Sequence, residues 1–182
     1  MGDDMDAISK DAIYTIQDIY ALPDGERAEL IDGQIYYMAP PGWKHQKLLN
    51  FIITEINLYI RNHNGNCEAL PAPFAVFLNK DERNYLEPDI SVICNASKLD
   101  EKGCHGAPDW VIEIVSPTSR VRDYYHKLIK YGTAGVREYW IVDPETRIIT
   151  VYTFEQDTVE QYRFGQDVPA GIFRGFSIRV ES

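Results

Sequence analysis

A carboxylate in the middle of an apolar run constrains this fold more than any other sequence feature. Residues 110–115 read Trp-Val-Ile-Glu-Ile-Val, a pattern typical of a central strand buried on both faces. Glu113 lies inside this run, and glutamates are almost never fully buried unless they are paired or bound to a metal. The sequence therefore predicts a cation, an arginine or a shared proton beside Glu113.

A second carboxylate, Asp89, opens another apolar strand, Asp-Ile-Ser-Val-Ile, directly after Glu87 and Pro88. If the two strands are neighbours, Asp89 and Glu113 can converge on one divalent cation, because hard cations prefer oxygen ligands. The alternative is structural, with Asp89 capping a turn and Glu113 paired to a lysine.

The rest of the chain predicts one mixed α/β domain. A length of 182 residues suits a single domain, which we place at residues 13–182 after an N-terminal tail of residues 1–12. Asp32-Gly33 between two apolar runs predicts a hairpin, and apolar residues at steps of three and four predict a helix over residues 44–62. We further expect strands at 138–142, 148–154 and 159–164, a loop at 95–108, and a helix from about Ser119 to Tyr131, ended by Gly132 and Gly135.

Charge and cysteine content narrow the class of protein. The net charge of −10 argues against a general nucleic-acid coating protein. Three cysteines, with no CxxC pair, cannot all pair, so we expect free and mostly buried thiols in a reducing compartment. The first ten residues contain no secretory signal, and no apolar run approaches the roughly 20 residues of a membrane helix. We expect a cytoplasmic protein with no membrane contact.

One segment departs from the acidic balance. Between Ser116 and Arg137 the chain has five basic residues and one acidic residue, a local charge of +4. Any phosphate-binding surface is expected there, and the alternative is a solvated helix face. The basic residues are Arg120, Arg122, Lys127, Lys130 and Arg137.

Several motifs, in order along residues 14–154, are similar to those of the Uma-type family of "putative restriction endonucleases" within the PD-(D/E)XK nuclease superfamily. The resemblance rests on their order and spacing. The motifs are Glu29-Leu30-Ile31-Asp32-Gly33, Ala39-Pro40-Pro41 followed by His45, Glu87-Pro88-Asp89, Val111 to Ser119, Asp123 with Lys127 and Tyr131, and Glu138 to Pro144.

The resemblance implies a restriction-endonuclease-like central mixed sheet flanked by helices. It also implies Mg²⁺ or Mn²⁺ held by Asp89 and Glu113, and hydrolysis of a phosphodiester. The superfamily pattern has a lysine two residues after the glutamate, but this chain has Val115 there. Lys127 is our replacement for the catalytic lysine, and its alternative role is a structural ion pair with Asp123.

Five other residues have expected roles near Asp89 and Glu113. Glu29 is a candidate third catalytic acid, or else an exposed strand start. His45 is interpreted as a helix-end residue that packs or caps rather than as a ligand. Arg120, Arg122 and Lys130 are expected to hold phosphates that flank the scissile bond, which sets register and not sequence.

These residues leave three functions open. The first is a metal-dependent DNA endonuclease, expected to be a homodimer because two sites cut two strands most easily. The second is a catalytically decayed nuclease-fold module that binds nucleic acid or a protein partner, with Val115 marking the lost chemistry. The third is a hydrolase with paired carboxylates, such as a glycosidase, which would need an aromatic platform for sugars.

Overall fold

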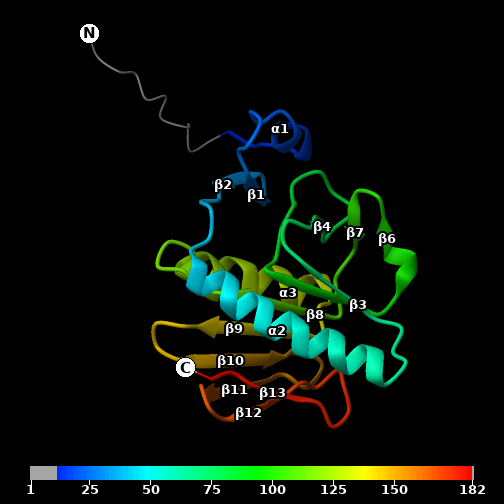
Figure 1. The fold of residues 1–182 in the computed structure, drawn as a ribbon. Helices are drawn as coiled ribbons and strands as arrows, with labels where there is room; N and C mark the ends of the chain where they lie inside the picture. Colours follow the sequence, from blue (N-terminus) through cyan, green and yellow to red (C-terminus); the bar gives the residue numbers. More distant parts are fainter. Residues whose placement is uncertain (1–11, 182) are drawn as a thin grey trace.

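The computed structural model describes residues 12–181, and its centre is a six-stranded mixed sheet with helices on both faces (Figure 1). The strand order is β11-β10-β9-β8-β5-β3. The β8–β9 pair is parallel and the other pairs are antiparallel. This arrangement confirms the predicted mixed α/β fold. The strands are β3 (Glu68–Pro71), β5 (Ile90–Ile93), β8 (Trp110–Ile114), β9 (Glu138–Asp143), β10 (Ile148–Thr153) and β11 (Thr158–Arg163).

Helix α2 (Trp43–Asn62) covers one face of the sheet and confirms the helix predicted over residues 44–62. Its buried residues recur every three or four positions, so they form one apolar face. That face packs on Trp110, Ile112 and Ile114 of β8. The buried residues of α2 are Leu49, Ile52, Ile53, Ile56 and Ile60.

The second helical segment packs on the opposite face. A π-helical stretch, η2 (Arg122–Lys127), continues into α3 (Leu128–Ala134). The helix passes through Gly132, where the sequence predicted an end, and stops at Gly135, whose φ of 94° is left-handed. A Cβ at Gly132 would lie 2.9 Å from the Phe154 ring, so glycine lets the ring pack against the helix.

The N-terminal region forms a separate small layer. Helix α1 (Ile16–Tyr20) precedes β1 (Ala28–Ile31) and β2 (Gln34–Tyr37). These strands pair antiparallel around Asp32 and Gly33, whose φ values are 51° and 77°, as a two-residue hairpin turn requires. The predicted hairpin is confirmed. The predicted tail lies outside the described residues except for residue 12.

The loop predicted over residues 95–108 is wrong, because that segment contains secondary structure. It holds a 3-10 turn (Ala96–Lys98) and strands β6 (Leu99–Asp100) and β7 (Gly103–His105), which join β4 (Val76–Phe77) in a three-stranded sheet. Strands of two or three residues are too short to show a hydrophobic period. Near the C-terminus, β12 (Asp167–Pro169) pairs with β13 (Ser177–Arg179) after the 3-10 turn Phe154–Gln156 and β11. Within residues 12–181, no helix combines the length and apolarity needed to cross a membrane.

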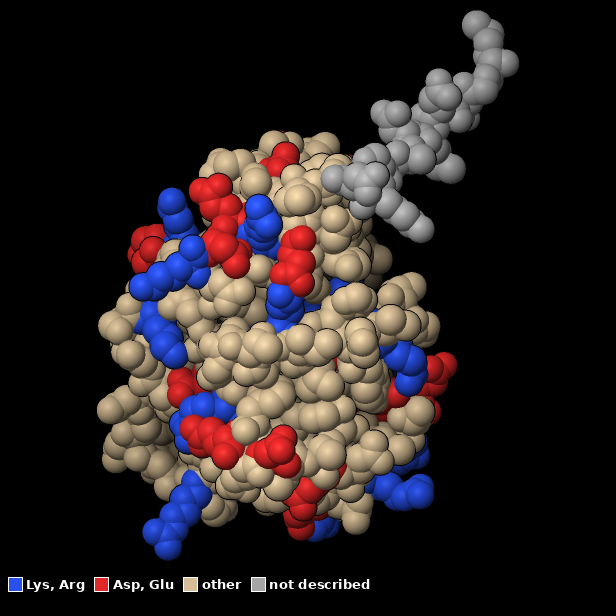
Figure 2. All heavy atoms as spheres, turned by 180° about the vertical axis from the view of Figure 1, so that it is seen from behind, with Lys and Arg blue, Asp and Glu red and all other residues tan. Residues whose placement is uncertain are grey.

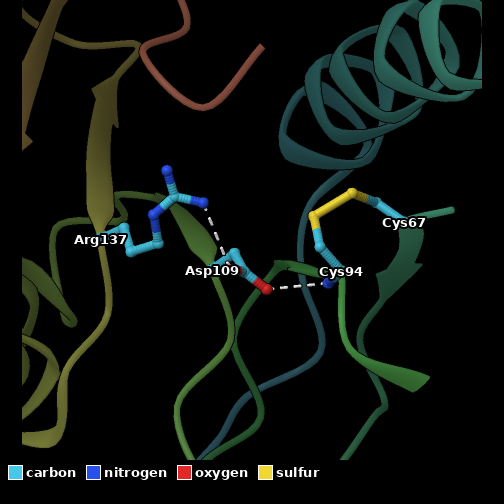
Figure 3. Close-up of a disulfide and its surroundings, with 4 residues drawn as sticks. All are labelled: Cys67, Cys94, Asp109 and Arg137. Carbon is cyan, nitrogen blue, oxygen red and sulfur yellow. Dashed lines mark hydrogen bonds and ion pairs between the residues drawn. A yellow bond between two sulfur atoms is a disulfide. The ribbon is translucent and has the colours of Figure 1, made fainter. Parts of the chain in front are cut away.

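The prediction of free thiols is wrong for two of the three cysteines. Cys67 and Cys94 form a disulfide (Figure 3). Cys104 is free and buried. An odd count excludes the pairing of all three cysteines but not of two. Glu68 pairs with Ile93 in the β3–β5 ladder, so the next position places Cys67 opposite Cys94. The backbone amide of Cys94 also donates to Asp109, which fixes this end of β5.

Thiol counting tests the disulfide directly. We expect a thiol reagent to count no thiol in the native protein, one after denaturation without reductant, and three after denaturation with reductant. Burial raises the pKa of Cys104 to about 11, so this thiol stays protonated and unreactive in the folded state at neutral pH. Three thiols in the denatured, unreduced protein would contradict the disulfide. A Cys104→Ala variant is the control and should read zero before reduction.

Candidate active site

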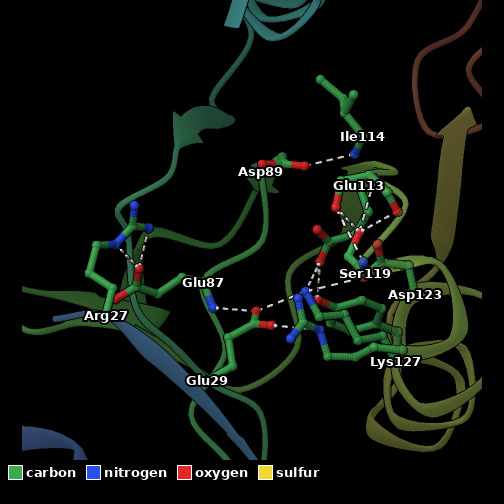
Figure 4. Close-up of polar contacts among 12 residues, drawn as sticks. Arg27, Glu29, Glu87, Asp89, Glu113, Ile114, Ser119, Asp123 and Lys127 are labelled. Atoms are coloured by element: carbon green, nitrogen blue, oxygen red, sulfur yellow. Dashed lines mark hydrogen bonds and ion pairs between the residues drawn. The ribbon is translucent and has the colours of Figure 1, made fainter. Parts of the chain in front are cut away.

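The two carboxylates singled out in the sequence face each other across neighbouring strands. In the β5–β8 ladder Ile90 pairs with Ile112, so one further step places Asp89 opposite Glu113. Asp89 is tied to the same strand end, because its Oδ2 accepts a hydrogen bond from the backbone amide of Ile114 at 2.7 Å (Figure 4). The condition set by the sequence, that the two strands are neighbours, is therefore met.

Glu113 is buried and has a close cationic partner. Its Oε1 accepts hydrogen bonds from Lys127 Nζ at 2.7 Å and from the Tyr131 hydroxyl at 2.8 Å. Burial raises the pKa of Glu113 well above its usual value, and Lys127 only partly opposes this rise, while the nearby carboxylates add to it. The site thus gathers carboxyl groups in a place where burial disfavours their charged form.

Lys127 is the hub of this cluster. Its Nζ lies 2.7 Å from Glu113, 2.8 Å from Glu29 and 3.6 Å from Asp123, and the side chain is only 2% exposed. Burial acts to lower the pKa of Lys127, but the carboxylates of Glu113, Glu29 and Asp123 outweigh it and raise the pKa above its usual value. Lys127 is therefore charged in the folded protein, and Asp123 is its most distant partner rather than its main one.

Glu29 enters the site from the N-terminal hairpin. Its side chain is fully buried, so the alternative of an exposed strand start is wrong. Its Oε1 accepts hydrogen bonds from the backbone amide of Glu87 at 3.0 Å and contacts Lys127, while its Oε2 lies 3.4 Å from Arg122 Nε. Glu29 therefore joins β1 to the helix and to the segment that carries Asp89. Glu87 itself pairs with Arg27 and accepts from the Tyr85 hydroxyl, away from this cluster.

The three cations expected to hold phosphate are all paired with carboxylates. Arg120 Nη1 lies 2.6 Å from Asp143, and Arg120 also contacts Glu145. Lys130 pairs with Asp32 from the hairpin turn. Arg122 faces Glu29 and lies over the Tyr36 ring, 5.6 Å from its centroid. Basic and acidic side chains are likewise interspersed on the face shown in Figure 2. Phosphate contact by Arg120, Arg122 and Lys130 stays a prediction, and each cation would have to leave or share a carboxylate.

His45 is a site residue that the sequence interpretation missed. Its Nε2 lies 3.2 Å from Oδ2 of Asp89, and its Nδ1 is buried without a hydrogen-bond partner in the part of the chain that the structure describes. Burial acts to lower the pKa of His45, but the hydrogen bond and charge of Asp89 outweigh it and raise the pKa. A signal was present, because His45 lies four residues before Leu49 and continues the inward face of α2.

The carboxylate pair suits a divalent cation that substrate and water complete. No group of three or more His, Cys, Asp and Glu side chains able to hold a metal occurs among residues 12–181. Within residues 12–181, the donors to Asp89 both contact Oδ2 and the donors to Glu113 both contact Oε1. The second oxygen of each carboxylate is therefore left for a cation. Mg²⁺ typically binds one or two carboxylates and takes its other ligands from water and substrate phosphates.

The fold and the site together define a restriction-endonuclease-like protein: a mixed sheet with opposed acidic residues on adjacent strands and a lysine beside them. The model of the Uma2 family, described as "Putative restriction endonuclease", matches residues 16–181. The chain belongs to this family, which confirms the resemblance inferred from the motifs.

One solved structure supports the fold. It is described as a "putative nuclease belonging to DUF820" from Anabaena variabilis, and it superposes with a TM-score of 0.71 at 24% identity, covering 87% of this chain and 89% of that chain. A comparison with curated proteins finds no match. Family and fold together support a nuclease, an enzyme that hydrolyses nucleic acid.

Substitution of Lys127 is expected to have a large effect on stability, because several buried carboxylates contact its ammonium group. We expect Lys127→Met to lower the free energy of unfolding by about 3–5 kcal/mol, because it leaves buried carboxylates without their cation. Adding Glu29→Gln to Lys127→Met should restore part of this loss, so the double variant should lose less than the sum of the two single variants. Urea denaturation followed by circular dichroism measures all three.

The matched control is Lys102→Met, which removes an exposed lysine from the turn between β6 and β7 and should change stability by less than about 0.5 kcal/mol. Equal, small effects of Lys102→Met and Lys127→Met would contradict the role of Lys127 as the hub.

Proposed function

We propose that this protein is a metal-dependent endonuclease that hydrolyses DNA phosphodiester bonds at Asp89 and Glu113. The observation that carries the proposal is the register that sets Asp89 opposite Glu113, with Lys127 Nζ 2.7 Å from Glu113. Membership of the Uma2 family supports the nuclease class. Asp89 and Glu113 would hold Mg²⁺ or Mn²⁺, which lowers the pKa of bound water and offsets the charge that grows on the phosphoryl group.

The residues of the chain have distinct tasks in this proposal. Asp89 and Glu113 would hold the cation. Asp89 is kept in place by Ile114 and His45, and Glu113 by Lys127 and Tyr131. Carboxylates held in fixed positions lose little free energy to reorganisation during the reaction. His45 is therefore a positioning residue for Asp89.

Lys127 is proposed to orient the attacking water. An ammonium has three N–H donors. One donates to Glu113 Oε1 at 2.7 Å, and Glu29 lies 2.8 Å from Nζ as an ion-pair partner. Asp123 lies 3.6 Å from Nζ, beyond hydrogen-bond range, so an N–H would remain to donate to a water molecule that enters with the cation and the substrate. The oxygen of that water would form a bond to phosphorus while the bond from phosphorus to the leaving sugar oxygen breaks. The attacking water would give up one proton to solvent, and the leaving oxygen would take up one proton from solvent, so that the step balances.

The proposal is tested with supercoiled plasmid. We expect nicking or linearisation with Mg²⁺ or Mn²⁺ and none with EDTA. Glu113→Gln and Asp89→Asn should each lower the rate by at least about a hundredfold, because each removes a group that holds charge at the reacting phosphate. Glu68→Gln, on the exposed first position of β3, is the matched control and should cut at the wild-type rate. Cutting that survives Glu113→Gln would contradict the assigned site.

The competing proposal is a decayed nuclease-fold module that binds nucleic acid or a protein partner. It is favoured by the buried valine at position 115, where the superfamily pattern has its lysine. DNA binding without cutting, across both metals and varied DNA sequences, would support this alternative. The homodimer expected for cutting both strands is a further proposal, and sedimentation of the free protein and of its DNA complex measures it.

A further inference from the structure

One tryptophan is exposed beside the candidate active site. Trp43, the first residue of α2, is 71% exposed, whereas Trp110 and Trp140 are fully buried and pack edge to face. Tryptophan has the largest apolar surface of any side chain, and folding usually buries most of it. A single exposed apolar residue needs no explanation by itself. The position of Trp43 and its neighbours supply the argument.

The end of α2 that carries Trp43 contacts Asp89, one of the two candidate metal ligands, through His45. His45 lies 3.2 Å from Asp89, and the Cα atoms of residues two apart in a helix are about 5.5 Å from each other. Successive residues turn by about 100°, so Lys44 flanks His45 and Trp43 lies on the outer side of the helix. Side chains in a helix lean toward its N-terminal end. A strand that leaves Asp89 and Glu113 over this end would meet Lys44 and then Trp43.

The charge around Trp43 suits a polyanion. Residues 33–54 contain no Asp or Glu, although the whole chain has a net charge of −10. Lys44 and Lys47 lie three residues apart, on adjoining parts of the helix surface, and make no ion pair with any described residue. Lys44 Nζ also lies 5.8 Å from the centroid of the Trp43 ring. These lysines differ from Arg120, Arg122 and Lys130, which already have carboxylate partners.

We propose that the first two turns of α2 bind the DNA strand next to the scissile phosphate: Trp43 stacks on an unpaired base, and Lys44 and Lys47 contact the adjoining phosphates. This inference rests on the proposed endonuclease function and names its substrate class, DNA that is single-stranded or locally open at the site. An indole face stacks on any base, so the contact adds affinity without sequence preference. Well-paired duplex would leave Trp43 without its base and bind more weakly.

Tryptophan fluorescence tests the stacking directly, because Trp43 is the exposed one among the three tryptophans. The experiment uses the full chain in EDTA with a 20-nucleotide single strand, so binding is observed without cleavage. We expect the strand to quench the solvent-exposed emission and to protect it from acrylamide, leaving the emission of the two buried tryptophans unchanged. No quenching at a DNA concentration that saturates a labelled-strand anisotropy titration would overturn the stacking contact.

Substitutions separate stacking from charge. In the anisotropy titration, Trp43→Phe should keep the affinity for the single strand, while Trp43→Ala should weaken it by about five- to one-hundredfold, the range for loss of one stacked base. The double variant Lys44→Ala/Lys47→Ala should reduce the slope of log affinity against log salt by about 1.4, since each phosphate contact on a single strand contributes about 0.7. Lys102→Ala is the matched control, in the turn between β6 and β7 on the right of Figure 1, whereas α2 begins on the left.

The outcomes distinguish this inference from the proposed function. One outcome is plasmid cutting without quenching of Trp43, with Trp43→Ala binding DNA as tightly as wild type. This outcome would agree with the proposed endonuclease and overturn the α2 contact. The opposite outcome is quenching of Trp43 in the wild type and weakened binding in Trp43→Ala, with no cutting. This outcome would support the α2 contact and contradict the proposed endonuclease function. If wild type and Trp43→Ala bind DNA equally well, and each binds single strand and duplex equally well, the surface contacts phosphates only. That result would overturn the base contact.

Discussion

The ammonium of Lys127 joins the N-terminal hairpin, the central strand and its own helix at one buried point. Its partners are Glu29 from the N-terminal hairpin, Glu113 from the central strand β8, and Asp123 from the preceding helical turn. A buried cation is tolerated only where charges and hydrogen bonds surround it, and loss of one partner leaves another uncompensated. The hairpin, the helix and the sheet are therefore coupled through this side chain, in addition to their apolar contacts.

The charge balance of the cluster explains why it suits a further cation. Glu29, Glu113 and Asp123 face Lys127 and Arg122, and Asp89 adds a fourth carboxylate nearby. Burial is the main cause that raises the pKa of Glu113 and Asp123. Lys127 opposes the rise only in part, and the neighbouring carboxylates, which outnumber the cations, add to it. A divalent cation at Asp89 and Glu113 would relieve this imbalance, so the electrostatics of the fold and the proposed chemistry point the same way.

The sequence predicts those features of the fold and the candidate site that depend on residues close together in the chain. Glu113 stood out because an apolar run surrounded it, and α2 because its apolar residues kept one period over five turns. The burial of Glu29 had no local signal, since it arises from contacts with Glu87 and Lys127, which lie 58 and 98 residues away. The Cys67–Cys94 bond likewise follows from strand register, which the cysteine count does not contain.

The net charge of residues 116–137 did not locate an unpaired basic surface, because ion pairs form between residues far apart in the sequence. The +4 segment is neutralised by carboxylates that the fold brings from other elements: Asp32 from the hairpin turn, Asp143 from the end of β9, and Glu145 from the turn after it. The two lysines at the start of α2 belong to a less basic stretch, but no carboxylate of the described chain comes to pair with them. A basic surface is thus set by which cations lack partners after folding, rather than by how many the sequence places together.

The position of the catalytic lysine candidate illustrates how one chemical arrangement can be reached from a different element. Val115 shares the face of Glu113, where a lysine would lie beside the carboxylate, but it packs into the core with Tyr131 and Tyr139 instead. Asp123, Lys127 and Tyr131 recur every four residues and form one inward stripe of the helix, and Lys127 and Tyr131 both donate to the same oxygen of Glu113. The helix therefore supplies an ammonium at the carboxylate while position 115 stays apolar, which keeps the end of β8 packed on both faces.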